Sequence, residues 1–361
     1  MDISKIDKNL KVESNINRES LVWFDASEAP FRIYGAYSTN PYMRLPDDVA
    51  KNTNEGVSGL NFHTAGVRVR FRTNSPFIAI KAVYHGVSNF SHMPLTGTSG
   101  FDLYRYHEGV QQYVATFIPP ADSRSGYDSI VDVCCGMSDY IINFPLYNHV
   151  DKLYLGLHCD AEFEVPAEYK YQNPIVFYGS SITQGGCASR PGNCYQNLLS
   201  QKLDFDYINL GFSGSARGED AIAEYMSGLN MSMFVSDYDH NAPNVEHLEK
   251  THYKLYETIR KKHPYIPYIM ISKPNINFIP FSDASPRVAD AQRRKVIMES
   301  YVKAMNNGDN NVYFVDGASI FSYDNFDSCT VDRTHPNDLG FYEFQKALYP
   351  IFKKLLHNDF R

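Results

Sequence analysis

The chain has 361 residues, of which 43% are hydrophobic and 21% are charged, an ordinary globular balance that excludes wholesale disorder. Lys and Arg number 34 against 41 Asp and Glu, giving a net charge of -7 without a long basic run, so we expect no nucleic-acid partner. No apolar stretch is long enough to cross a bilayer, and the polar N-terminus lacks the apolar centre of a signal peptide. We therefore expect a cytoplasmic protein with no membrane partner.

The six cysteines lack the paired spacing that holds a zinc ion, so we expect no metal site of that class. Cys187 and Cys194 bracket a short loop and would bridge only in an oxidising setting. We expect reduced thiols, because nothing else in the chain indicates export.

The first part of the chain has the period-two alternation of half-buried β-strands. Short strands separated by Gly, Pro, Asn and Ser are predicted at residues 67–73, 77–84, 101–107, 113–118 and 152–157. No amphipathic helix stands out between them. We therefore predict a β-sandwich domain over residues 1–170.

The second part alternates strands with helices. Strands are predicted at 174–178, 206–212, 231–237, 267–272 and 312–317, with helices around 193–203, 217–228, 244–263, 285–306 and 338–357. Five strands, each followed by a helix, predict a doubly wound α/β domain with a parallel five-stranded sheet over residues 171–361. Sites in such sheets form beyond the carboxyl ends of the strands, where we look for chemistry.

Three of these strand ends carry reactive or flexible residues. Ser181 follows the first strand in a Gly-Ser-Ser turn, which is either a plain small-residue loop or an exposed nucleophile; a P-loop is disfavoured because its Lys-Ser/Thr ending is absent. The second strand runs into the glycine-rich stretch 209–218. The third runs into 236–243, which offers carboxylates, an imidazole and an amide, residues that also favour turns and helix caps.

Asp332 and His335 lie three residues apart on a loop before the last predicted helix, and Pro336 keeps His335 out of helical geometry. An isolated pair of this kind is usually a capping or surface pair. Together with the three strand ends, however, it completes a set of nucleophile, base, acid and hydrogen-bond donors. Such a set indicates nucleophilic catalysis.

In this order the four stretches resemble the sequence blocks of the SGNH/GDSL hydrolase superfamily. The blocks are Gly179–Thr183, Asn209–Gly214, Asp239–Asn241 and Asp332–His335, and the resemblance covers about residues 174–357. The run Gly-Phe-Asp-Leu-Tyr at 100–104 resembles the GxDLY signature of a β-sandwich that precedes some of these hydrolases, and 185–193 is similar to their extended serine block.

This resemblance implies a flavodoxin-like hydrolase domain preceded by a jelly-roll-like sandwich, and a serine esterase that needs no cofactor or metal. Ser181 would be the nucleophile, His335 the general base and Asp332 the residue that orients it, with an oxyanion hole of the Ser181 and Gly214 N–H groups and the Asn241 side chain. Two positions depart from the family pattern: Ser180 replaces the usual Asp, and the third block reads Tyr-Asp-His-Asn instead of Gly-x-Asn-Asp.

Two-domain members of the superfamily are often carbohydrate O-acetyl esterases, so the predicted substrate is a small-molecule or oligosaccharide acetyl ester. His92 and Met93, on a loop before the GxDLY run, are candidates for substrate binding or for a structural role. Arg190 is a candidate for a polar substrate, or equally for a surface or inter-domain ion pair. A lipase or thioesterase of the same fold, and a non-catalytic carbohydrate-binding protein with a vestigial serine, remain alternatives.

Overall fold

The computed structural model describes residues 14–134, 136–274 and 285–358, which divide into two compact units. The sandwich unit contains the chain up to Arg44, Phe62–Tyr169 and Ser189–Gly192. The sheet unit contains Leu45–Asn61, Lys170–Ala188 and the chain from Asn193 onward. The units thus exchange two short segments, and the domain division at 1–170 and 171–361 stays a prediction.

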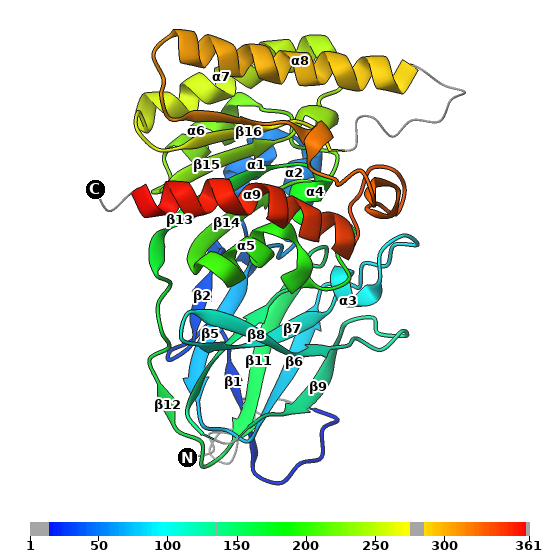
Figure 1. Cartoon of the computed structure of the whole chain (residues 1–361). Coiled ribbons are helices and arrows are strands. Elements are labelled where there is room, and N and C mark those ends of the chain that lie inside the picture. Colours follow the sequence, from blue (N-terminus) through cyan, green and yellow to red (C-terminus); the bar gives the residue numbers. More distant parts are fainter. Residues whose placement is uncertain (1–13, 135, 275–284, 359–361) are drawn as a thin grey trace. The chain divides into compact units, whose positions relative to one another are not determined.

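The sandwich unit is built almost entirely from antiparallel strands. They are β1 (Leu21–Asp25), β2 (Arg32–Tyr34), β3 (Ser38–Thr39), β4 (Tyr42–Met43), β5 (Arg68–Thr73), β6 (Phe77–Tyr84), β7 (Phe101–His107), β8 (Val110–Phe117), β9 (Gly126–Asp132), β10 (Ser138–Asn143), β11 (Val150–His158) and β12 (Phe163–Glu164), with the short helix α3 (Leu95–Thr98). One sheet has the order β1-β11-β6-β9 and the other β12-β5-β10-β7-β8, with β2 beside β5 (Figure 1).

The core of this unit follows from the alternation along its strands. Ile78 and Ile80 of β6 and Leu153 and Leu155 of β11 are fully buried in one cluster, to which Phe71 of β5 on the other sheet also belongs. Apolar faces of two antiparallel sheets that share one core make a sandwich. The predicted β-sandwich is therefore confirmed, although β1 to β4, β9, β10 and β12 were not among the predicted strands.

The sheet unit has a five-stranded parallel sheet of order β14-β13-β15-β16-β17. Its strands are β13 (Tyr171–Gly179), β14 (Phe205–Gly211), β15 (Met233–Asp237), β16 (Tyr268–Ile271) and β17 (Val312–Val315). Its helices are α1 (Asp47–Thr53), α2 (Glu55–Leu60), α4 (Ser181–Gln184), α5 (Tyr195–Leu203), α6 (Asp220–Ser227), α7 (Val245–Lys262), α8 (Ser285–Asn306) and α9 (Asp338–Asn358).

Helices cover both faces of this sheet (Figure 1). Val176 and Tyr178 of the interior strand β13 belong to a buried cluster with apolar side chains of α6, α7 and α8. Phe177 points to the opposite face, where its ring stacks on Phe352 of α9 at 5.9 Å and meets the edge of Tyr195 of α5 at 5.7 Å. The continuous apolar run of β13 is thus explained by burial on both faces, and the predicted doubly wound α/β fold is confirmed.

The expectation that the first part of the chain lacks amphipathic helices is wrong. The helices α1 and α2 interrupt the sandwich sequence and pack with the sheet unit, burying Ala50 and Val57 completely. Each has at most two turns, too short for an apolar period to stand out. Among the described residues, no helix combines the length and apolar character needed to span a bilayer.

Candidate active site

The serine turn joins β13 to α4. Ser181 is the first residue of α4 and only 5% exposed, whereas Ser180 precedes the helix as its N-cap. The Ser180 hydroxyl accepts a hydrogen bond from the N–H of Ile182 at 3.1 Å. Asp and Ser are both good N-cap residues, because each offers a short side-chain oxygen to the first free amides. Ser at position 180 therefore keeps the capping that the more usual Asp would provide.

The loop that carries the predicted base is closed on itself. An isolated bridge pairs Thr330 with Pro336, and the Asp332 carboxylate accepts hydrogen bonds from the N–H groups of Thr334 at 3.0 Å and His335 at 2.8 Å. Partial burial raises the pKa of Asp332, but hydrogen bonds from the His335 N–H and imidazole outweigh it, and the net pKa is lowered. Asp332 is therefore an anion throughout the neutral range.

Three side chains from this loop and the serine turn form a continuous hydrogen-bond chain. The Ser181 Oγ lies 2.8 Å from Nε2 of His335, and Nδ1 of His335 lies 2.7 Å from Oδ2 of Asp332. Because Asp332 is bonded to Nδ1, Nε2 is the nitrogen left facing the serine, where it is within reach of the hydroxyl proton. The structure thus brings together Ser181, Asp332 and His335.

The glycine-rich loop after β14 lies against the serine turn and the third block. The N–H of Phe212 donates to the carbonyl of Gly179 at 2.8 Å, and the N–H of Ser213 donates to Oε1 of Gln184 at 3.0 Å. The Nδ2 of Asn241 donates to the carbonyl of Phe212 at 3.1 Å. The first, second and third blocks are therefore joined at one end of the sheet.

Gly214 stands at the turn of the same loop with a φ of 67°. This left-handed conformation favours glycine, because a side chain there meets the backbone. Within the described chain, the N–H of Gly214 donates no hydrogen bond. An unoccupied N–H in a preformed turn is what an oxyanion hole requires, but the role of Gly214 and Asn241 in one stays a prediction.

Two fully buried carboxylates, Asp237 and Asp239, lie at this end of the sheet, the second of them in the third block. Burial raises the pKa of Asp237 to about 6, partly offset by His240. The neighbouring Asp239 accepts from the N–H and Nδ1 of His240 and, through its other oxygen, from the N–H of Lys273 at 3.0 Å. Both oxygens of Asp239 thus hold the third block in place.

The three substrate candidates of the sequence analysis all belong to the sandwich unit. Arg190 donates to Oδ2 of the fully buried Asp102 at 2.9 Å and to the hydroxyl of Tyr104, so its guanidinium is bonded to the GxDLY run. Met93 is buried and His92 is exposed, next to a bridge between Phe90 and Met93. A part in substrate binding stays a prediction for these residues.

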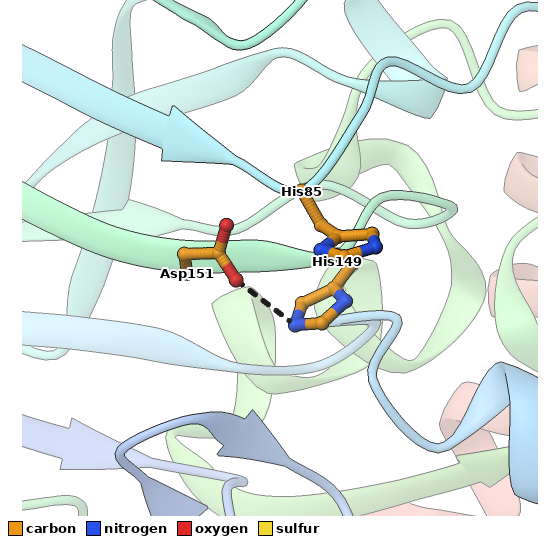
Figure 2. A group of neighbouring side chains, drawn as sticks. All are labelled: His85, His149 and Asp151. Carbon is orange, nitrogen blue, oxygen red and sulfur yellow. Dashed lines mark ion pairs between the residues drawn. The ribbon is translucent and has the colours of Figure 1, made fainter.

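Within the described residues, two groups of side chains that could ligate a metal lie in the sandwich unit, one of His158, Cys159 and Asp160 and one of His85, His149 and Asp151. Figure 2 shows Asp151 of β11 beside His149, with an ion-pair distance of 3.3 Å, and His85 from the end of β6 stacked on the same imidazole. The two rings are 5.0 Å apart and only 20° from parallel. Imidazole lone pairs lie in the ring plane, so the stacking of these two rings does not favour their binding one ion together.

Comparisons with known proteins agree with this geometry. A family model described as the GDSL-like lipase/acylhydrolase family matches residues 172–353, about half of the chain. The chain belongs to this family. A second model, GxDLY, described as the N-terminus of SGNH-hydrolase-type esterases, matches residues 21–163. This member of the GDSL-like family is a carboxylic ester hydrolase with the predicted two-part organisation.

Solved structures similar to this GDSL-like hydrolase share its whole fold. A crystal structure described as a GDSL-like lipase from Bacteroides ovatus has a TM-score of 0.83 at 27% identity, covering 93% of this chain and 98% of the other. A salicylyl-acyltransferase of a tetracycline biosynthetic pathway has a TM-score of 0.76 at 19% identity, covering 94% and 98%. A family two carbohydrate esterase from Clostridium thermocellum, solved with cellohexaose, has a TM-score of 0.57 at 13% identity, covering 82% and 94%. No curated protein matches the chain.

Proposed function

We propose that the protein hydrolyses acetyl esters of sugars or oligosaccharides through a Ser181–His335–Asp332 triad. The observation that carries the proposal is the unbroken chain of two hydrogen bonds, 2.8 and 2.7 Å long, from the serine hydroxyl through the imidazole to the carboxylate. A serine hydroxyl is a weak nucleophile at neutral pH, and such a chain provides the base that activates it.

In the proposed reaction, Ser181 Oγ attacks the ester carbonyl while Nε2 of His335 takes its proton. Asp332 holds the imidazole through Nδ1 and stabilises the imidazolium that forms. The oxyanion is stabilised by the N–H groups of Ser181 and Gly214 and by the Asn241 amide. His335 then gives the proton to the leaving alcohol. A water molecule, activated by His335 in the same way, attacks the acyl-enzyme, which releases acetate and frees the serine.

The choice of a small acyl group rests on the loops that carry the proposed oxyanion donors. Residues 212–219 and 238–244, which follow β14 and β15, consist mainly of small and polar side chains and contribute no apolar lid. Long acyl chains need an extended apolar surface to replace water, whereas an acetyl group does not. A carbohydrate alcohol is proposed because a carbohydrate esterase solved with cellohexaose has a similar fold over 82% of this chain.

The test is hydrolysis of p-nitrophenyl acetate, butyrate and octanoate by the wild type and by Ser181→Ala, together with labelling by a fluorophosphonate. We expect turnover on acetate to exceed that on octanoate and to vanish in Ser181→Ala, with the label located on Ser181 by mass spectrometry. Unchanged turnover in Ser181→Ala would overturn the triad. Rates that rise with chain length would overturn the acetyl assignment and favour the lipase or thioesterase alternative.

A further inference from the structure

The helical hairpin α1–α2 lies between β4 and β5 of the sandwich in the sequence but forms part of the sheet unit. Its ends are joined by Asn61, whose amide accepts from the N–H of Leu45 and donates to its carbonyl, both at 2.9 Å. Ala50 and Val57 are fully buried in the cluster that also contains Phe212 of the glycine loop. The hairpin is therefore fixed at both ends and packed beside that loop.

Asn54 connects the hairpin to the glycine loop by hydrogen bonds. Its Oδ1 caps α2 by accepting from the N–H of Val57 at 2.8 Å. Its Nδ2 donates to the carbonyl of Ser215 at 2.9 Å and to Oε1 of Glu219 at 2.6 Å. One side chain thus ends the helix and holds the residue that directly follows Gly214.

Gly56, in the first turn of α2, lies against the side chain of Ser215. A Cβ at position 56 would lie 2.8 Å from the Cβ of Ser215 and even closer to its Oγ, nearer than real Cβ atoms approach. Ser215 cannot move alone, because its N–H donates to the carbonyl of Phe212 at 2.9 Å and its hydroxyl donates to the backbone carbonyl of Ser213 at 3.1 Å. A side chain at position 56 would therefore push on the whole turn that carries Gly214.

We infer that α2 supports the turn that forms the oxyanion hole, with Asn54 and Gly56 as positioning residues that set the direction of the Gly214 N–H. The inference rests on the proposed function, in which that N–H stabilises the oxyanion. Such a donor works only within a narrow range of distance from the developing charge, and losing one costs about 100- to 1,000-fold in kcat. A displaced donor is expected to lose part of that factor, while substrate binding, which does not depend on it, stays unchanged.

The experiment tests the contact between position 56 and the side chain of Ser215. Gly56→Ala adds a Cβ, Ser215→Gly removes the atoms that it would meet, and the double variant combines them. We expect kcat on p-nitrophenyl acetate to fall at least tenfold in Gly56→Ala with KM within twofold of the wild type. In the double variant, kcat returns to within threefold of Ser215→Gly alone. The rate of fluorophosphonate labelling of Ser181 falls and recovers in parallel, because the phosphoryl oxygen occupies the oxyanion site.

Gly59→Ala is the matched control, because the same substitution on the same helix meets no atom within 4 Å. We expect it to leave kcat within twofold of the wild type. Asn54→Ser provides a second variant, since serine still caps a helix but is too short to reach the Ser215 carbonyl. It should also lower kcat without raising KM, with far-UV circular dichroism unchanged.

The inference is overturned if Gly56→Ala keeps its kcat within twofold of the wild type, or if the double variant is no better than Gly56→Ala. It is also overturned if KM rises while kcat holds, because that pattern belongs to lost substrate binding. Failure of the proposed function is separate: it would appear as activity in Ser181→Ala, whatever the variants at position 56 do.

Discussion

Replacing Asp102 by Ala tests why the GxDLY run is present. Asp102 is fully buried and accepts three hydrogen bonds: from Nη1 of Arg190 at 2.9 Å, from the N–H of Gly192 at 2.7 Å and from Nδ2 of Asn143 at 2.9 Å. Its carboxylate therefore joins β7 and β10 to the segment Ser189–Gly192, which follows the serine turn in the chain.

These contacts determine how much stability Asp102→Ala should lose. Removing one partner of a buried ion pair costs about 3–5 kcal/mol, because the other charge remains without its counterion. The Arg190 side chain is 21% exposed and regains some water, which favours the lower value. The two uncharged donors each add about 1 kcal/mol when left unsatisfied. We expect the free energy of unfolding of the sandwich unit to fall by about 5 kcal/mol.

The single tryptophan allows the unfolding of the sandwich unit to be measured separately. Trp23 lies in β1 of the sandwich unit, so its fluorescence during urea unfolding reports on that unit, and ester hydrolysis reports on the other. With a urea dependence of about 2 kcal/mol per M, the Trp23 midpoint should shift by about 2.5 M. Asp102→Asn, which keeps an acceptor, should shift it by about half as much.

Asp160→Ala is the control for this measurement, because its side chain is 87% exposed and its loss should be nearly neutral. If Asp102→Ala moves the Trp23 midpoint no further than Asp160→Ala does, the buried carboxylate does not hold the sandwich unit together. The reasoning from burial and hydrogen bonding would then be wrong.

Three further predictions concern the sheet unit. Because burial raises the pKa of Asp237 to about 6, the folded state binds its proton more tightly than the unfolded state, and stability is lost as the pH rises from about 4 through 6. Asp237→Asn should therefore increase the free energy of unfolding by about 1–3 kcal/mol at pH 8 and hardly change it at pH 4, as urea titrations followed by circular dichroism would reveal. Ser180→Asp should keep kcat on p-nitrophenyl acetate within threefold, whereas a large loss would mean that Ser180 does more than cap α4. Asn241→Ala should lower kcat about a hundredfold, and a loss below threefold would point to another donor in residues 237–241.

The sequence predicted those parts of the site whose geometry is local. Asp332 and His335 share one loop, and Ser181 lies in the turn that follows a strand. The spacing of these residues in the sequence therefore already indicated the Asp–His pair and the position of the serine at a strand end. Ser181 and His335 are 154 residues apart, yet the carboxyl ends of parallel strands meet at one edge, which brings such residues together. The alternation of apolar strands and amphipathic helices therefore sufficed to predict the fold and the edge of the sheet at which these residues meet, whereas their roles were implied by the resemblance to the SGNH/GDSL sequence blocks.

The features that the sequence did not predict depend on partners far away in the chain. Helices as short as α1 and α2 are not stable on their own, and their few apolar residues become informative only when the sheet unit buries them. Asp237 looked like an ordinary turn residue, because its burial is produced by neighbouring strands and helices. For Arg190, a substrate contact and an ion pair were equally compatible with the sequence, and only the position of Asp102 reveals its bond.

The two exchanged segments indicate that the sandwich is not simply an appended binding module. Residues 45–61 leave the sandwich sequence to join the sheet unit, and residues 189–192 leave the hydrolase sequence to join the sandwich unit. A polar side chain fixes each segment. Asn54, within residues 45–61, donates to the carbonyl of Ser215 in the glycine loop. Asp102 accepts from the N–H of Gly192, within residues 189–192, a segment that follows the serine turn along the chain. A polar group that is buried among partners from distant parts of the chain is costly to leave unpaired, so neither segment can detach without leaving such groups exposed or unsatisfied. The glycine turn is therefore anchored by residues 45–61, which belong to the sheet unit although they precede its first strand by more than 100 residues.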